Sequence, residues 1–122
     1  MLLFFLPVVA QSYRVHLCDS LPPAAGEMLV QRFTQMLEAG GLAVSETGTP
    51  LEVTVEVKDR METPGSISQV ALSVEIKAAA GAVEEVFPVK GVGENEADAW
   101  LRAVKQLLPR SKAAQAFVSK LK

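Results

Sequence analysis

Three segments of regular alternation between apolar and polar residues constrain the fold of this chain more than any other feature. Residues 51–58 read LEVTVEVK, with leucine or valine at every odd position and a polar residue at every even one. A second alternating segment covers residues 70–78, and a third covers residues 83–89. A period of two places the apolar side chains on one face of a β-strand. The pattern therefore predicts an antiparallel sheet with one buried and one solvent-exposed face.

The second and third of these strands are expected to form a hairpin. A two-residue loop at residues 80–81 would pair apolar residues on the inner face and would set Lys77 opposite Glu84 on the outer face. Cross-strand pairs of this kind stabilise antiparallel strands. The same register leaves Glu85 opposite Ile76 on the inner face, which indicates either a bulge or the margin of the sheet.

Helical spacing of apolar residues predicts three α-helices. The first begins at the prolines of LPPAAGE and ends at residues 40–41, two glycines that suit a left-handed cap. Asn95 is the predicted N-cap of the second helix, which Pro109 ends, and Ser111 caps the third. The predicted apolar faces comprise Ala25, Met28, Leu29, Phe33, Met36 and Leu37, then Ala97, Trp100, Leu101, Val104, Leu107 and Leu108, and finally Ala114, Phe117, Val118 and Leu121.

Two shorter segments, residues 13–18 and 42–45, are predicted as strands on either side of the first helix. The element order is then β-α-β-β-β-β-α-α, because no linker divides residues 11–122. We predict a single α+β domain, a two-layer sandwich in which the helices cover one face of a mostly antiparallel sheet. Trp100 is expected to anchor the core of this domain rather than a ligand.

Residues 1–10, MLLFFLPVVA, are predicted to be a signal peptide. Val8 and Ala10 occupy the positions three and one before a cut that signal peptidase reads, although no basic residue precedes the apolar run. The alternative is a buried first strand of a cytosolic domain, which Pro7 disfavours. The run is also shorter than the roughly 20 residues of a transmembrane helix. We therefore expect a periplasmic or secreted bacterial protein.

Charge is unevenly distributed along the chain. Six basic and no acidic residues follow Asp98, whereas the preceding part carries fourteen acidic and six basic residues. The net charge of −2 gives no reason to expect nucleic-acid binding. The basic segment either forms solvated helix faces or docks onto an anionic partner, such as phospholipid head groups or an acidic protein. The candidate interaction residues are Arg102, Lys105, Arg110 and Lys112.

The only cysteine and the only histidine, Cys18 and His16, share one face of the first predicted strand, and Asp19 follows them. They are either a thiol–imidazole pair or two isolated surface residues, since a nucleophilic site needs a third, orienting group. Zinc would need more ligands of this kind, and no metal, cofactor or catalytic residue is predicted. In an oxidising compartment Cys18 is buried, stays free or links two chains as a disulfide dimer. Leu17 rather than a small residue precedes Cys18, so lipid attachment is not predicted there.

The passage KGVGENEADAW places two glycines near a predicted helix start. It lacks the spacing of nucleotide-binding motifs, and the carboxylates of Glu94, Glu96 and Asp98 would repel a phosphate. Gly91 and Gly93 are instead predicted to shape a sharp turn from strand to helix.

The element order and the pattern LSVEIKAAAGAVEEVFPVKGVGENEADAWLRAVKQL together resemble small βαβββα domains of bacterial envelope proteins. In that pattern a hairpin turns at the AAGA step, and a GxGxNExDA passage enters the last helix. The resemblance covers residues 13–108 and extends to the amino-terminal domain of the TolB type, the curli-secretion lipoprotein type and the lipoprotein activators of penicillin-binding proteins. It implies a non-catalytic adaptor that binds other envelope proteins, and it carries over no site residues.

The sequence thus favours an exported, non-catalytic domain that acts as a protein-binding adaptor or accessory factor. An edge strand of its small sheet could accept a strand from the partner. One alternative is a small thiol-dependent enzyme or redox protein that uses Cys18 with His16. Another is a small-ligand carrier with a pocket between the sheet and the first helix.

Overall fold

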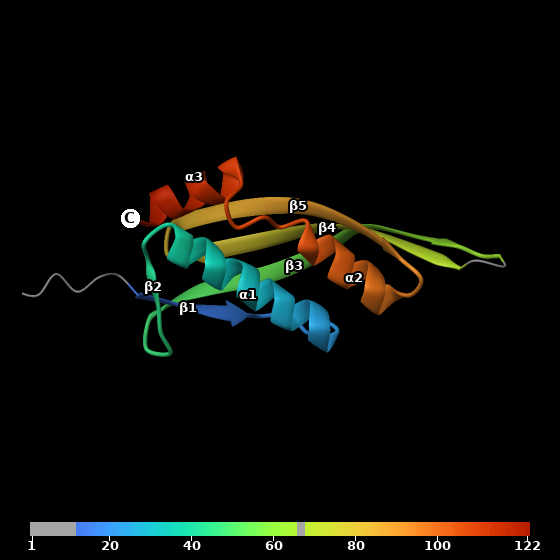
Figure 1. The fold of residues 1–122 in the computed structure, drawn as a ribbon, viewed down its shortest axis with the longest axis horizontal. Coiled ribbons are helices and arrows are strands. Elements are labelled where there is room, and N and C mark those ends of the chain that lie inside the picture. The colour runs from blue at the N-terminus through green and yellow to red at the C-terminus, as the bar shows by residue number, and fades with distance from the viewer. Residues whose placement is uncertain (1–11, 66–67) are drawn as a thin grey trace, which may run out of the picture.

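The computed structural model describes residues 12–65 and 68–122, so the predicted signal peptide lies outside the described residues. Five strands form one sheet in the order β2-β1-β3-β4-β5, and three helices lie over one of its faces (Figure 1). This arrangement confirms the predicted α+β architecture and element order. The elements are β1 Ser12–Leu17, α1 Pro23–Ala39, β2 Ala43–Val44, β3 Thr49–Thr63, β4 Gln69–Ala80, β5 Val83–Gly93, α2 Glu96–Lys105 and α3 Lys112–Leu121.

Strand β1 is the parallel member of the sheet. It pairs in parallel with β2 on one side and with β3 on the other, whereas β3, β4 and β5 are consecutive antiparallel strands. Tyr13 is buried, and Val15 and Leu17 pack against the core. Arg14 and His16 point to the exposed side. The predicted division of this strand between two faces is therefore confirmed.

Helix α1 ends at its two glycines, as predicted. Gly41 has φ +83°, and its N–H donates to the carbonyl of Glu38 at 3.0 Å. The N–H of Leu42 donates to the carbonyl of Leu37 at 2.9 Å. These bonds satisfy carbonyls that the end of a helix would otherwise leave free. The buried residues of the helix are Ala25, Leu29, Phe33, Met36 and Leu37.

The β4–β5 hairpin has a different register from the predicted one. Ala80 lies opposite Val83, so the loop is residues 81–82 instead of 80–81. Gly81 adopts φ +60°, which suits the first central residue of a type II′ turn. The faces of the strands are nevertheless as predicted, because the shift amounts to two residues along one strand.

Glu85 explains why the inner face of β5 carries one charged residue. It lies opposite Ala78 instead of Ile76, and its side chain is 27% exposed. Its Oε2 accepts a hydrogen bond from Nζ of Lys120 in α3 at 3.2 Å. Glu85 is therefore paired with a helix of the covering layer and does not mark a bulge.

Helix α2 packs against β5 through backbone atoms. A Cβ atom on Gly91 would lie 2.9 Å from the Cα of Ala103, and one on Gly93 would lie 2.6 Å from Oδ2 of Asp98. Neither glycine has a positive φ. The two glycines therefore permit close approach of the helix, and the prediction of a sharp turn was wrong. Ala99 and Ala103 are both 0% exposed in this contact.

Helix α2 is also shorter than its apolar pattern predicts, since it ends at Lys105. Trp100 and Val104 are buried as expected. Ala97 is exposed, and Leu108 is 56% exposed because it follows the helix in an irregular connection. Helical spacing no longer decides which way a side chain points beyond the last turn.

Three aromatic rings join the helix layer to the sheet. The ring centroid of Phe87 in β5 lies 5.8 Å from that of Phe33 in α1 and 5.9 Å from that of Phe117 in α3, both edge to face. The hydroxyl of Tyr13 donates to the carbonyl of Leu121 at 3.1 Å and ties β1 to the last turn of α3. Edge-to-face contacts of this kind add to the stabilisation from burial.

Strand β3 contains a β-bulge that the sequence pattern does not reveal. Val57 lies opposite Val74 and Asp59 lies opposite Ser73, so Lys58 is the extra residue. Val57 is 43% exposed instead of buried, on a stretch of β3 that extends past the end of β1. Beyond the bulge, the ends of β3 and β4 project past the helices (Figure 1).

Candidate functional site

Cys18 and His16 lie on the same exposed side of β1, as predicted, but the structure shows no thiol–imidazole pair between them. The Sγ of Cys18 lies 3.9 Å from the carbonyl oxygen of His16, so the contact involves the backbone and not the ring. Asp19 accepts a hydrogen bond from the N–H of Val55 at 2.8 Å. This carboxylate therefore caps the edge of β3 where β1 ends.

The described core offers no polar centre for chemistry. No buried residue in residues 12–65 and 68–122 is polar or charged. The same ranges hold no group of three His, Cys, Asp or Glu side chains that could bind a metal ion. No helix of this part is long and apolar enough to cross a membrane. The candidate functional features are therefore surfaces.

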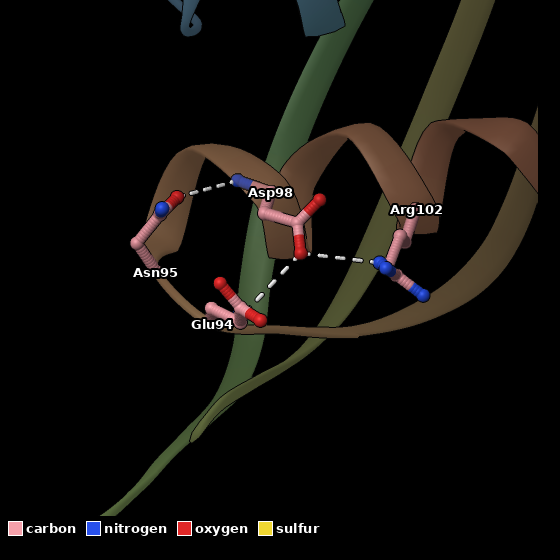
Figure 2. A network of polar contacts seen from close by, with 4 residues as sticks. All are labelled: Glu94, Asn95, Asp98 and Arg102. Carbon is pink, nitrogen blue, oxygen red and sulfur yellow. Dashed lines mark hydrogen bonds and ion pairs between the residues drawn. The ribbon is translucent and has the colours of Figure 1, made fainter. Parts of the chain in front are cut away.

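The start of α2 holds one of the predicted interaction residues in a polar network (Figure 2). The N–H of Asp98 donates to Oδ1 of Asn95 at 2.8 Å, which confirms Asn95 as the N-cap. Oδ2 of Asp98 accepts from the N–H of Glu94 at 3.2 Å and from Nε of Arg102 at 3.1 Å. Arg102 is therefore tied to the first turn of its own helix.

The four predicted interaction residues do not form one surface. Arg102 and Lys105 line a shallow groove beside Lys90 of β5. Arg110 lines a different groove, against α1. Lys112 is exposed as the first residue of α3. The sequence placed these residues in one segment, and the connection between the helices separates them in space.

The second groove combines basic and apolar side chains and is called here the basic groove. It is an open groove of about 760 Å³ between the C-terminal half of α1 and the connection from α2 to α3. Its lining includes Arg32, Glu38 and Ala39 from α1, and Leu108, Pro109 and Arg110 from the connection. Sequence reasoning identified Arg110 but missed Arg32, which lies 78 positions earlier in the chain.

Part of the outer face of the sheet is charged, as the glutamates of the alternating strands predict. Nζ of Lys58 lies 3.4 Å from Glu56 and 3.7 Å from Glu75. The hydrogen bond and negative charge of Glu56, together with Glu75, raise the pKa of Lys58 above its ordinary value. Lys77 and Glu84 form the predicted ion pair at 3.2 Å, although they are diagonal rather than directly opposite.

An apolar row crosses the same face near the projecting end of the sheet. Met61 lies opposite Ala71, which in turn lies opposite Val92, so the row spans β3, β4 and β5. Met61 is 62% exposed and Val92 is 49% exposed. The bulge at Lys58 turns Met61 to this face, which is why simple alternation could not predict the row. The helices of the described chain all lie on the other face (Figure 1).

The edge of β5 is poorly suited to accept another strand. Pro88 has no N–H to donate, and the N–H of Lys90 donates to Oε1 of Gln106 at 3.1 Å. The free stretch of β3 carries the bulge and a run of charged side chains. Bulges, prolines and charges are common means of protecting sheet edges from added strands.

Comparisons with known proteins concern the fold alone. No protein-family model and no curated protein matches the chain. The structure is similar to that of a minor lipoprotein from Acinetobacter baumannii, with a TM-score of 0.45 and 12% identity over 93% of this chain and 91% of that one. It is also similar to a PelC dodecamer from Paraburkholderia phytofirmans, with a TM-score of 0.35 and 13% identity over 90% of this chain and 79% of that one. The likeness to a bacterial lipoprotein agrees with the fold-level resemblance to envelope domains and assigns no activity.

Proposed function

We propose that this protein is an exported, non-enzymatic accessory domain of the bacterial envelope that binds another protein through the outer face of its sheet. The apolar row carries the proposal. Met61 and Val92 are large, exposed and aligned across Ala71 on a face that the helices do not cover. Grouped apolar side chains on an exposed surface are typical of interaction sites. Charged neighbours such as Lys58 and Asp59 would form the polar rim.

The export part of the proposal is supported by the apolar residues 1–10 and the small residues that end them. Expression of the full chain in a bacterial host, followed by fractionation and intact-mass measurement, tests it. A periplasmic species that begins at Gln11 would support export and cleavage. An uncut chain confined to the cytoplasm would overturn this part.

The non-enzymatic part is supported by the placement of the one thiol and the one imidazole. Cys18 contacts the backbone of His16 and not its ring, and Asp19 is engaged by the N–H of Val55. A nucleophilic thiol needs a base within hydrogen-bond distance and a group that orients this base. The described geometry therefore favours binding over catalysis.

The binding part can be tested by site-specific photo-crosslinking in cells. A photoreactive phenylalanine in place of Met61 should give a discrete crosslinked species with one partner, and Val92→Asp in the same chain should abolish it. The matched control is the same photoreactive residue in place of Glu52, an exposed position of β3 outside the apolar row. If the folded protein gives no crosslink from position 61, or gives the same species from both positions, the proposal is wrong.

A further inference from the structure

We propose that the basic groove binds an acidic segment of a partner protein, with carboxylates of that segment on Arg32 and Arg110 and an apolar side chain on Leu108. This inference rests on the proposed function, because it adds a second partner surface to a domain that acts by binding proteins. The apolar row lies on the outer face of the sheet, whereas the basic groove lies within the helix layer.

The apolar part of the groove is built by the early end of α2. The helix stops at Lys105, so the connection turns Leu108 outward to 56% exposure. Pro109 and Ala39 also line this part of the groove. A partner side chain that covers Leu108 would remove apolar surface from water on both molecules. Leucine beside arginine in a concave surface can therefore supply both an apolar anchor and a polar clamp.

The charged part of the groove favours carboxylates. Arg32 and Arg110 form no ion pair within 4.0 Å in the described parts of the chain. The Nε of Arg32 is also buried without a hydrogen-bond acceptor there. A buried donor without a partner is costly, and a planar guanidinium matches a carboxylate in two-pronged geometry. An acidic side chain in the groove would complete these contacts.

The neighbouring helix end adds to the attraction. Ser111 caps α3 by accepting the N–H of Ala114 at 3.2 Å, and the first turn of α3 has no acidic residue. The positive end of the helix dipole at this point therefore favours an anion in the groove. Glu38 is the one acidic residue of the lining. Its charge should oppose an acidic segment, so its removal provides a test with the opposite sign.

The shape of the groove favours a peptide over a membrane surface. Two separate elements supply its walls, and the side chains converge on an open hollow of about 760 Å³. A protruding side chain of a peptide can enter a hollow, whereas a bilayer meets a protein on its outermost surface. Anionic vesicles are therefore the competing probe in the experiment.

The experiment measures fluorescence anisotropy of a fluorescein-labelled octapeptide of alternating glutamate and leucine, titrated with the full chain. The expected result is saturable binding that Arg32→Gln and Arg110→Gln each weaken by about fivefold or more. Glu38→Gln should strengthen binding about twofold, since it removes a like charge. Lys90→Gln is the matched control, because Lys90 is an exposed cation outside the groove, and it should leave the affinity unchanged. Amide chemical shifts on titration should change mainly in residues 32–39 and 108–111.

Several outcomes would overturn the inference. These are no binding of the peptide, equal binding of a glutamine–leucine peptide, equal losses in Lys90→Gln, or shift changes outside the groove. Binding of phosphatidylglycerol vesicles that depends on Arg110, without peptide binding, would assign the groove to a membrane instead. The crosslink from position 61 is a separate readout. Its loss with intact peptide binding would overturn the proposed function alone, and the reverse result would overturn this inference alone.

Discussion

Gly91 of β5 lies against the backbone of Ala103 in α2, with no room for a side chain between the strand and the helix. A Cβ atom on Gly91 would approach the Cα of Ala103 to 2.9 Å, closer than carbon atoms pack without strain. This contact sets the height of α2 above the sheet. It therefore also fixes the start of the connection that carries Leu108 and Arg110 into the basic groove.

Substitution Gly91→Ala should push α2 away from β5 and lower the free energy of unfolding by about 1–3 kcal/mol, because backbone atoms cannot rotate out of the way. Chemical denaturation with urea measures the change. Gly26→Ala is the matched control within α1. A Cβ there would meet Leu17 at an ordinary 3.5 Å, and alanine favours a helix interior by about 0.5–1 kcal/mol. The close-approach explanation fails if both substitutions stabilise the protein.

The N-cap of α2 should contribute measurably to stability. Oδ1 of Asn95 accepts the N–H of Asp98 at 2.8 Å (Figure 2). Asn95→Ala removes this acceptor and should cost about 0.5–2 kcal/mol in the free energy of unfolding. Hydrogen exchange of the Asp98 amide should quicken in the same variant. Asn95→Ser keeps a capping oxygen and should stay within a few tenths of the wild-type value, so a serine variant as unstable as the alanine variant would contradict the assignment.

The surface placement of Cys18 can be tested independently of His16. Because Cys18 contacts only the carbonyl oxygen of His16, His16→Ala should change the rate of maleimide alkylation of Cys18 by less than about twofold. A much larger fall would show that the imidazole activates the thiol and would revive the thiol-enzyme alternative. Oxidation of the concentrated protein should give a dimer on non-reducing electrophoresis, and Cys18→Ser should abolish it. A wild-type protein that stays monomeric after oxidation would exclude the disulfide dimer.

Local rules were sufficient for most of the architecture. Alternation located Leu51 and Val53, both 0% exposed, and capping residues such as Asn95 and Ser111 located the helix starts. These predictions succeed because each depends on residues within a few positions of each other. The charged Glu85 on the inner face did not fit the local pattern, because its partner, Lys120, is contributed by a helix 35 positions away.

The candidate surfaces were harder to predict because each depends on an irregularity. The bulge at Lys58 shifts the parity of β3 and turns Met61 outward, although the alternation before it is regular. The early end of α2 exposes Leu108, and only tertiary packing brings Arg32 to the same groove. A one-dimensional pattern carries the period of an element but not the positions at which that period breaks.

The protection of the β5 edge gives a prediction about self-association. Pro88 offers no donor, and Gln106 occupies the N–H of Lys90 at 3.1 Å. The double substitution Pro88→Val with Gln106→Ala should leave a longer row of free N–H groups, which invites edge-to-edge pairing. We expect the variant to form larger species with rising concentration in size-exclusion chromatography with light scattering, under reducing conditions that exclude a Cys18 disulfide. The matched control is Gln115→Ala, a glutamine that donates to the carbonyl of Arg110 away from the sheet, and it should behave as the wild type. If the double variant keeps the size distribution of the wild type at every concentration, Pro88 and Gln106 do not protect the edge, and β5 again becomes a candidate for strand addition.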